Sequence, residues 1–218
     1  MGELEGTLKW FKKDKSPGLD GWSVEFYLSF FETIGLELLN VIEECRSTGR
    51  LYEAINNTFI ALIPKVNSPE SFSDFTPISL YNCLCKIIAK IITNHIKLIL
   101  SDNISFEQFS FLHNRQIHEA IGTTHESLHS IKLKNLKGTI LKIDLSKSFG
   151  CVSWLYIKML LTHLGFCIPF IRWIMCCITS ISFNVLINGS TSHFFHVETG
   201  LRHRCPLSPL LFLLFMED

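Results

Sequence analysis

Hydrophobic and polar residues follow two periodicities along this chain. Apolar side chains that recur three and four positions apart predict amphipathic helices, and strict alternation predicts strands. The helical pattern covers residues 23–31, 36–45, 83–100, 117–131, 154–164, 169–179 and 207–216. Gly49 and Gly165 stand where two of these helices should stop, and Ser153 can cap the start of one. We predict strands at 58–63, 183–187 and 192–197, the last two joined by a tight turn at Asn188-Gly189.

One further alternating stretch organises the rest. Between Thr139 and Leu145, every second residue is aliphatic or β-branched (139, 141, 143 and 145), and Ile140, Lys142 and Asp144 lie between them. This alternation predicts a buried strand with Asp144 near its end. A carboxylate that closes an apolar strand is costly to bury unless it meets a cation, so Asp144 is a candidate metal ligand. The alternative, an Asp that starts a turn or caps the next helix, stays open on this stretch alone.

Helices and strands alternate in no regular order, and this decides the fold class. A doubly wound sheet would need a strict strand–helix–strand succession, which is absent here. We therefore predict an α+β fold. Its 218 residues suffice for one domain or for two closely packed subdomains.

Composition favours a reduced, intracellular setting. Hydrophobic residues make up 47% of the chain, yet the apolar run at 210–216 is far shorter than the ~20 residues of a membrane span. The first residues carry no signal-peptide pattern, and the eight cysteines form no Cys-x-x-Cys pair. We expect a protein of the nucleus or cytoplasm with small, reduced core thiols and no membrane partner.

Charge is balanced, with 20 basic and 20 acidic residues, so the whole chain lacks the basic excess typical of nucleic-acid binding. Two local lysine clusters remain. They are Lys9, Lys12, Lys13 and Lys15, and then Lys132, Lys134, Lys137, Lys142 and Lys147. Each alone is typical of an ordinary solvated face.

Five separated stretches, taken together and in order, carry a resemblance. They are 15–21 (KSPGLDG), 75–80 (FTPISL) with the helix at 86–90, 107–111 (EQFSF), 144–149 (DLSKSF), and 200–209 with its CPLSP ending. The chain resembles the reverse transcriptase of plant non-LTR retrotransposons, the long interspersed elements, over nearly its whole length.

This resemblance implies a right-hand polymerase fold, with a fingers-like region over 1–137 and a partial palm over 138–218. Such enzymes copy an RNA template into DNA from a DNA primer, using deoxynucleoside triphosphates and two Mg²⁺ ions held by converging carboxylates. By resemblance, Asp144 is the catalytic residue and Mg²⁺ ligand. The implied nucleotide-binding residues are Leu145, through its carbonyl, Phe149, His203, Arg204 and Pro206.

Several positions depart from the family pattern. Thr76 replaces an Arg suited to triphosphate oxygens, and His203-Arg204-Cys205 replaces Gln-Gly-Asp, which puts a bulky residue where backbone should approach the nucleotide. Ser110 replaces a Gly or Ala, Asn114 replaces a Gly, and Gly150 replaces an Asp. We therefore expect a degenerate domain.

The sequence stops at Asp218, before the expected aromatic-Ala-Asp-Asp hairpin and thumb. The acids after Asp144 are Glu198, Glu217 and Asp218, none in a hairpin-tip pattern. We expect a truncated reverse transcriptase domain, without a thumb and catalytically inactive.

Three alternatives remain. His125-Glu126-Ser127-Leu128-His129 matches the His-Glu-x-x-His zinc motif of metalloproteases, although Lys132 and Asn135 stand where the longer motif needs Gly and a third His. The lysine clusters and His118 allow a non-catalytic RNA- or DNA-binding remnant. The chain could also be a decayed element's product without a selected role.

Overall fold

The computed structural model describes residues 1–13, 15–112, 114–145 and 148–217. The helices of the described part are α1 (Gly2–Trp10), α2 (Val24–Ser29), α3 (Phe31–Thr48), α4 (Glu53–Asn56), α5 (Cys83–Asn103), α6 (Ile117–Leu133), α7 (Trp154–His163), α8 (Ile168–Thr179) and α9 (Ser208–Glu217). Two 3₁₀ turns, η1 (Phe72–Asp74) and η2 (Ser148–Cys151), accompany them. The strands are β1 (Thr58–Pro64), β2 (Phe75–Tyr81), β3 (Ser182–Ile187), β4 (Ser190–Thr191) and β5 (Phe195–His196). This mixture confirms the predicted α+β class.

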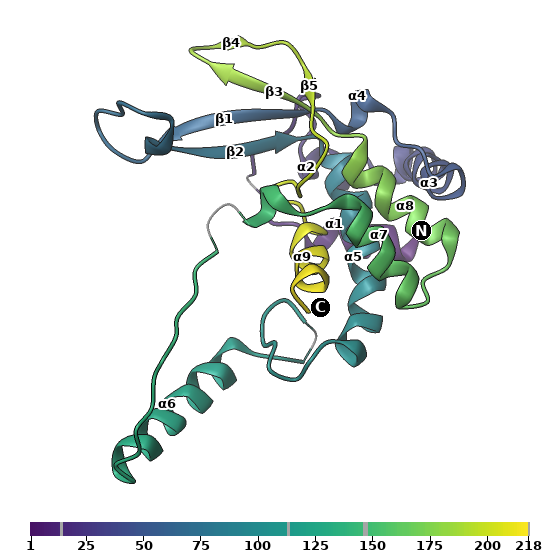
Figure 1. Cartoon of the computed structure of the whole chain (residues 1–218). Helices are drawn as coiled ribbons and strands as arrows, with labels where there is room; N and C mark the ends of the chain where they lie inside the picture. Colours follow the sequence, from purple (N-terminus) through teal and green to yellow (C-terminus); the bar gives the residue numbers. More distant parts are fainter. Residues whose placement is uncertain (14, 113, 146–147, 218) are drawn as a thin grey trace.

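A small mixed sheet lies beside a group of helices (Figure 1). Its order is β2-β1-β3-β4, with β5 also paired to β3. β1 runs antiparallel to β2 and parallel to β3, so that Ala61 faces Ile78 on one side and Leu186 on the other. The sheet therefore joins strands from residues 58–81 with strands from residues 182–196.

Local signals in the sequence set several boundaries. Gly49 ends α3 with φ 63°, in the left-handed region that glycine adopts without a steric penalty. The Ser153 side chain accepts a hydrogen bond from the Tyr156 backbone N–H at the start of α7. Asn188 and Gly189 have φ 49° and 79°, as a two-residue hairpin turn requires. These three predictions are confirmed.

The core forms where α5 meets α8 and α9, both of which also pack against α7. Ile87, Ile88, Ile92 and Ile96 of α5 are fully buried, and Trp173 of α8 packs in the same cluster. The expected burial of the last helix is confirmed by Leu210, Leu211 and their neighbours. None of the described helices combines the length and hydrophobicity needed to cross a membrane.

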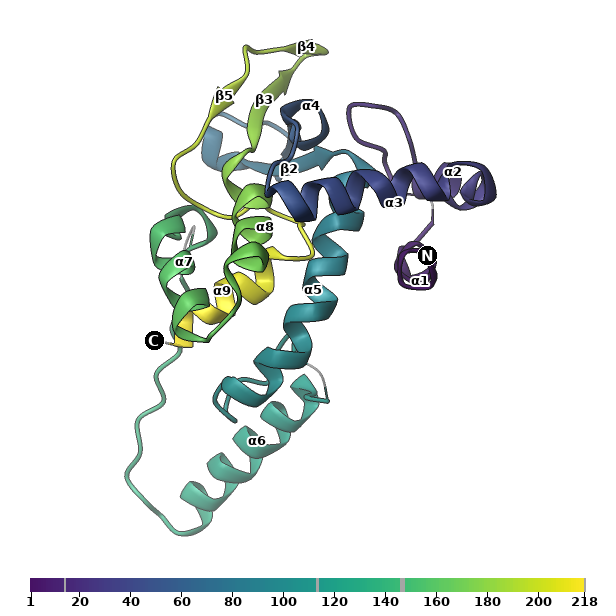
Figure 2. The ribbon, with the colours of Figure 1, turned by 90° about the vertical axis from the view of Figure 1, so that its right-hand side faces the viewer.

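α6 and the segment after it stand apart from this core. Figure 2 shows α6 projecting from the body, with residues 134–145 returning as a single extended trace. No residue of α6 is buried, among those the structure describes. This arm holds the stretch for which we predicted a buried strand.

That prediction is wrong. Residues 136–145 have no regular secondary structure, and Leu141 is 80% exposed. Alternation identifies side chains suited to a pleated surface, but a strand also needs neighbours for its backbone N–H and C=O groups. No strand of the described residues lies alongside this segment.

Candidate functional site

The loop from Gly200 to Pro206 is fastened to the turn η2. The backbone N–H of Gly200 donates to the Val152 carbonyl and that of Leu201 to the Phe149 carbonyl, both at 2.8 Å. Trp154 Nε1 donates to the Gly200 carbonyl at 2.6 Å. A Cβ at Gly200 would lie 3.0 Å from the Gly150 carbonyl oxygen, and its φ of +92° also favours glycine. The loop and η2 therefore hold a fixed relative position.

This attachment brings two of the predicted nucleotide-binding residues together. The Phe149 and His203 rings are stacked, with centroids 5.7 Å apart and planes inclined by 27°. Phe149 also stacks on Phe212 of α9 at 4.7 Å, which anchors it to the core. His203 itself is exposed. The pair therefore presents an aromatic surface that Phe212 supports on the side of the core.

Arg204 and Pro206 follow in the same loop. Arg204 is exposed and has φ 62°, in the left-handed region where a non-glycine residue is strained. Its carbonyl accepts a hydrogen bond from the Tyr81 hydroxyl at 3.3 Å. Asn114, at another position where the family pattern has Gly, has φ 59°. Both residues thus adopt a backbone conformation that favours glycine.

Sequence analysis missed Arg202, which is only 4% exposed. Its guanidinium lies over the Tyr81 ring at 4.2 Å, and its Nη2 donates to Asn56 Oδ1 and to the Cys177 carbonyl. The Nε and Nη1 groups have no hydrogen-bond partner in the described part of the chain. Arg202 ties the loop to β2 and to the end of α4.

A cavity of about 210 Å³ lies between this loop and the sheet. Gly150, Gly200 and His203 line one side, and residues of β1, β2 and β3 line the other. Thr76, the departure from the expected Arg, is exposed on β2. The loop that carries the predicted nucleotide-binding residues His203, Arg204 and Pro206 thus meets η2 and the sheet at this cavity.

Asp144 and Leu145 are placed differently. Both are exposed on the extended segment before η2, and among the described residues Asp144 has no ion pair or hydrogen bond. Ser146 and Lys147 of the same motif, with Asp218, lie outside the described residues. The structure therefore does not bring Asp144 into contact with the 200–206 loop.

The donor set does not fit a resident pair of Mg²⁺ ions. Mg²⁺ prefers six oxygen ligands, and a two-metal site needs several carboxylates close together. No group of three or more His, Cys, Asp or Glu side chains able to hold a metal occurs in the described ranges. Among the described residues 134–145, Asp144 is the one acidic residue, and it is exposed.

The zinc motif lies on α6, as predicted. His125 and His129 share one face of the helix, but both are exposed, and no third ligand joins them among the residues described. Lys132, Lys134, Lys137 and Lys142 are likewise exposed, which fits solvated side chains, and Lys9 pairs with Glu5 at 2.6 Å. This arrangement gives the metalloprotease alternative no support.

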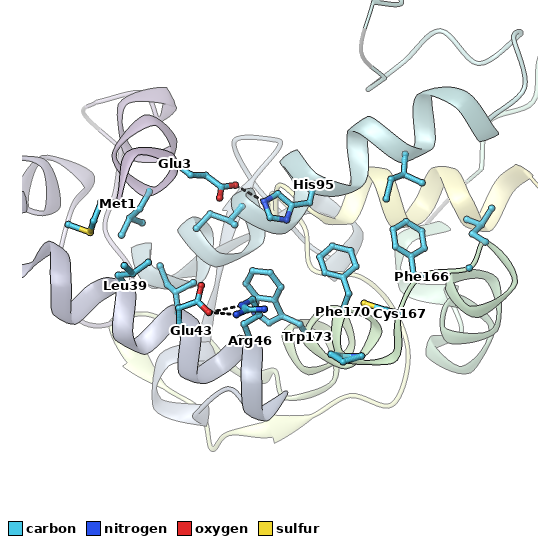
Figure 3. A pocket seen from close by; sticks show the side chains of 17 residues that line it. Met1, Glu3, Leu39, Glu43, Arg46, His95, Phe166, Cys167, Phe170 and Trp173 are labelled. Carbon is cyan, nitrogen blue, oxygen red and sulfur yellow. Dashed lines mark hydrogen bonds and ion pairs between the residues drawn. The ribbon is translucent and has the colours of Figure 1, made fainter.

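A larger cavity of about 780 Å³ opens elsewhere, between α1, α3, α5 and α8 (Figure 3). Its walls are mainly aliphatic and aromatic, and include Phe166, Phe170 and Trp173. The acidic side chains in it are already paired, Glu3 with His95 and Glu43 with Arg46, each at 2.6 Å. It offers no free charged side chain to a phosphate.

Comparison with known proteins gives two kinds of match. Residues 63–218 match the family described as "Reverse transcriptase (RNA-dependent DNA polymerase)". The chain is 29% identical over 217 residues to the "Transposon TX1 uncharacterized 149 kDa protein" of Xenopus laevis, which covers 100% of this chain and 17% of that protein. It is 30% identical over 93 residues to the "Retrovirus-related Pol polyprotein from type-1 retrotransposable element R2" of Popillia japonica, covering 41% of this chain and 15% of that protein. The chain thus spans about a sixth of the length of these relatives.

Proposed function

Because the chain belongs to the reverse transcriptase (RNA-dependent DNA polymerase) family, we propose that it is the nucleotide-handling part of a non-LTR retrotransposon protein that copies RNA into DNA. Its partners would be an RNA template, a DNA primer and deoxynucleoside triphosphates. The plant source, the intracellular setting and the division into fingers (1–137) and partial palm (138–218) belong to this proposal.

The observation that carries the proposal is the junction of η2 with the 200–206 loop. Phe149 and His203 form a stacked aromatic pair, of which His203 is exposed. The pair lies beside a cavity that is lined in part by Gly150 and Gly200, which have no side chains. Aromatic rings suit the stacking of a base or sugar, and backbone without side chains permits close approach. The Arg204 guanidinium, exposed next to His203, can meet phosphate oxygens.

The remaining assignments concern Asp144 and Leu145. We assign the Asp144 carboxylate, with the Leu145 carbonyl, as oxygen ligands for Mg²⁺, which the family generally uses. The described carboxylates do not form a cluster that could hold the two ions of the family's reaction. Together with Thr76 and Arg204, this supports a degenerate domain whose 218 residues do not extend a primer alone.

Primer extension tests this proposal. The purified chain and Asp144→Ala would be incubated with a homopolymer RNA template, a DNA primer, the matching nucleotide and Mg²⁺ or Mn²⁺. We expect no extension from either protein. Extension that Asp144→Ala abolishes would show that the missing carboxylates come from elsewhere and would refute the inactive assignment, while extension equal in both would refute the role of Asp144.

A further inference from the structure

Two buried cysteines from distant parts of the chain meet between α3 and α8. The Sγ atoms of Cys45 on α3 and Cys176 on α8 lie 4.0 Å apart, although the two residues are 131 positions apart in the sequence. The two helices pack against each other (Figure 2). Cys45 is 3% exposed and Cys176 is 8% exposed. The contact therefore lies inside the core and does not depend on what covers the outer surface of the chain.

Thiols in contact can bind a soft metal ion or can be oxidised to a disulfide. In the part of the chain that the structure describes, no three His, Cys, Asp or Glu side chains come together in a way that could hold a metal. All eight cysteines are free thiols. A disulfide between Cys45 and Cys176 needs a bond of about 2.0 Å, so the two sulfur atoms must approach by about 2 Å. Rotation of the two side chains and a small shift of one helix can supply that approach.

The two thiols differ in their access to solvent. Cys176 lines a cavity of about 740 Å³ that lies between the C-terminal end of α3 and α8, with Glu44 and Arg172 also in its wall. Cys45 is not among the described residues that line this cavity. A molecule as small as hydrogen peroxide fits in such a space. It would meet the Cys176 sulfur before it could meet that of Cys45.

We propose that Cys45 and Cys176 form an oxidisable pair, in which Cys176 reacts with a peroxide and Cys45 then closes a disulfide between α3 and α8. In the first step the Cys176 sulfur attacks one peroxide oxygen, the O–O bond breaks, and the departing hydroxide takes the thiol proton and leaves as water. The product is a sulfenic acid at Cys176. In the second step the Cys45 sulfur attacks the Cys176 sulfur, the S–O bond breaks, and a second water leaves with the Cys45 proton. Two thiols thereby lose two electrons, and one peroxide is reduced to two waters.

Hydrogen bonding in the pair favours this order of events. The Cys176 thiol donates to the Trp173 carbonyl at 3.1 Å, so Cys45 is left as the donor in the contact between the two sulfur atoms. A donor that points at a sulfur atom stabilises the thiolate form of that sulfur, and the thiolate is the nucleophile. Cys176 is therefore the first of the two to be attacked by an oxidant, and Cys45 is the resolving thiol.

The pair should nevertheless stay reduced until an oxidant is present. A hydrogen bond with Cys177 raises the pKa of Cys176, the contact with Cys45 acts in the opposite direction, and burial raises the pKa further. The pKa of Cys45 is raised by its hydrogen bond with Cys176 and by burial, with a smaller contribution from Glu44. Both thiols are protonated at neutral pH, so they should be oxidised more slowly than an exposed thiol.

The disulfide would act on the fold by joining two distant segments. It closes a loop between residues 131 positions apart, and a long closed loop restricts the unfolded chain more than the folded one. It also holds α8 next to Cys177, whose carbonyl accepts hydrogen bonds from Asn56 and Arg202. The proposal is independent of the proposed enzymatic function, because it concerns thiol oxidation and not nucleotides.

Mass spectrometry of the purified chain tests the disulfide. In a background with the exposed Cys151 and Cys167 changed to Ser, hydrogen peroxide should lower the mass of the chain by about 2 Da, and dithiothreitol should restore it. Tryptic digestion should then join the peptide that contains Cys45 to the peptide that contains Cys176. The absence of a reducible cross-link between these two peptides would overturn the proposal.

Single substitutions assign the two roles. Cys45→Ala should abolish the cross-link and leave a sulfenic acid at Cys176 that dimedone traps, whereas Cys176→Ala should abolish both products. Cys177→Ala is the matched control, since it removes the neighbouring buried thiol of the same helix and should keep the cross-link. A cross-link that survives in Cys45→Ala would show that another thiol resolves the sulfenic acid and would overturn the pairing. Because the cross-linked peptide is also identified without either alanine variant, the test holds even where a variant fails to fold.

Urea denaturation tests the effect on the fold. The oxidised background protein should unfold at a midpoint about 1 M higher in urea than the reduced protein. Cys45→Ala treated with the same peroxide should show no such increase. A midpoint that is unchanged or lower after the disulfide has formed would overturn the stabilising role of the bond.

Discussion

The guanidinium carbon of Arg202 lies 4.2 Å from the centre of the Tyr81 ring, and both side chains are almost completely buried. Within the described residues Arg202 forms no ion pair with a carboxylate, so the ring and the oxygens of Asn56 and Cys177 are the groups that stabilise its charge. The same Tyr81 donates its hydroxyl hydrogen to the Arg204 carbonyl. One aromatic residue of β2 therefore supports the candidate nucleotide-binding loop at two positions, Arg202 and Arg204.

Substitutions at Tyr81 should separate its two contributions. Tyr81→Phe keeps the ring under Arg202 and loses only the hydroxyl bond, which should cost about 0.5–1.5 kcal/mol of unfolding free energy. Tyr81→Ala removes the ring and should cost about 3–5 kcal/mol. Urea denaturation of both variants measures this difference. Tyr52→Ala, at an exposed tyrosine, should leave the free energy of unfolding within about 0.5 kcal/mol of the parent value. Equal losses in Tyr81→Ala and Tyr52→Ala would contradict the account.

Burial of Tyr81 also predicts sensitivity to alkali. Desolvation raises its pKa well above the ordinary value of 10.0, with the neighbouring Cys205 adding to the effect. The folded state therefore keeps the phenol neutral while the unfolded chain ionises, so this stabilisation is full below pH 10.0 and is lost as the pH rises beyond it. Unfolding free energies measured across this range should fall with pH.

Tyr81→Phe provides the control for that pH dependence. It should reduce the slope without abolishing it, because burial also raises the pKa of Tyr27. An unchanged slope in Tyr81→Phe would show that the phenol ionises equally in both states, contrary to its burial.

The contact between Gly200 and η2 leads to a third prediction. A methyl group at Gly200 would meet the Gly150 carbonyl and Cα at 3.0 and 3.1 Å, on a backbone already at φ +92°. Gly200→Ala should therefore lower stability by about 1–3 kcal/mol. Gly150→Ala is the matched control, because a Cβ there has no atom within 4 Å, and thermal unfolding of the two should differ accordingly. A larger loss at Gly150 would contradict the packing.

Replacement of Arg204 by glycine should stabilise the protein. Its φ of 62° is a conformation that costs a non-glycine residue about 1–2 kcal/mol, so Arg204→Gly should raise the unfolding free energy by about 1 kcal/mol. Arg204→Ala keeps the Cβ and the strain, and should not stabilise. Chemical denaturation of the three proteins decides this, and stabilisation by alanine as well as glycine would point to loss of the charge as the cause.

Local backbone chemistry explains why much of the fold could be predicted. Asn188-Gly189, Gly49 and the Ser153 cap each encode their conformation within a few residues. The period of Ile87, Ile91 and Ile92 likewise marks the buried face of α5 without further information. α1 was missed although Leu4 and Leu8, four positions apart, are both buried, because the surrounding glycines and charges masked a short pattern.

The predictions that failed concern features that depend on contacts between residues far apart in the sequence. Residues 139–145 have a strand's composition, but whether a strand forms depends on a partner that composition does not specify. The partners of Arg202 are Asn56 and Cys177, far from it in sequence, so no spacing could have revealed them. The sequence does not single out Arg202 as the buried cation either, because Arg204 lies two positions further along the same loop and is exposed. Phe149 and His203 were each named as nucleotide-binding residues through the family resemblance, and their contact with one another was not predicted.

Calorimetric titration of the chain with a deoxynucleoside triphosphate, with and without Mg²⁺, tests the central claim most directly. We predict weak, Mg²⁺-dependent binding that falls by about fivefold or more in His203→Ala, which removes one ring of the aromatic pair, and also falls in Asp144→Ala. Tyr52→Ala should bind like the parent. Equal affinity in all four proteins, or binding unaffected by Mg²⁺, would contradict the assignment of a nucleotide site to the loop at 200–206 and of a metal ligand to Asp144.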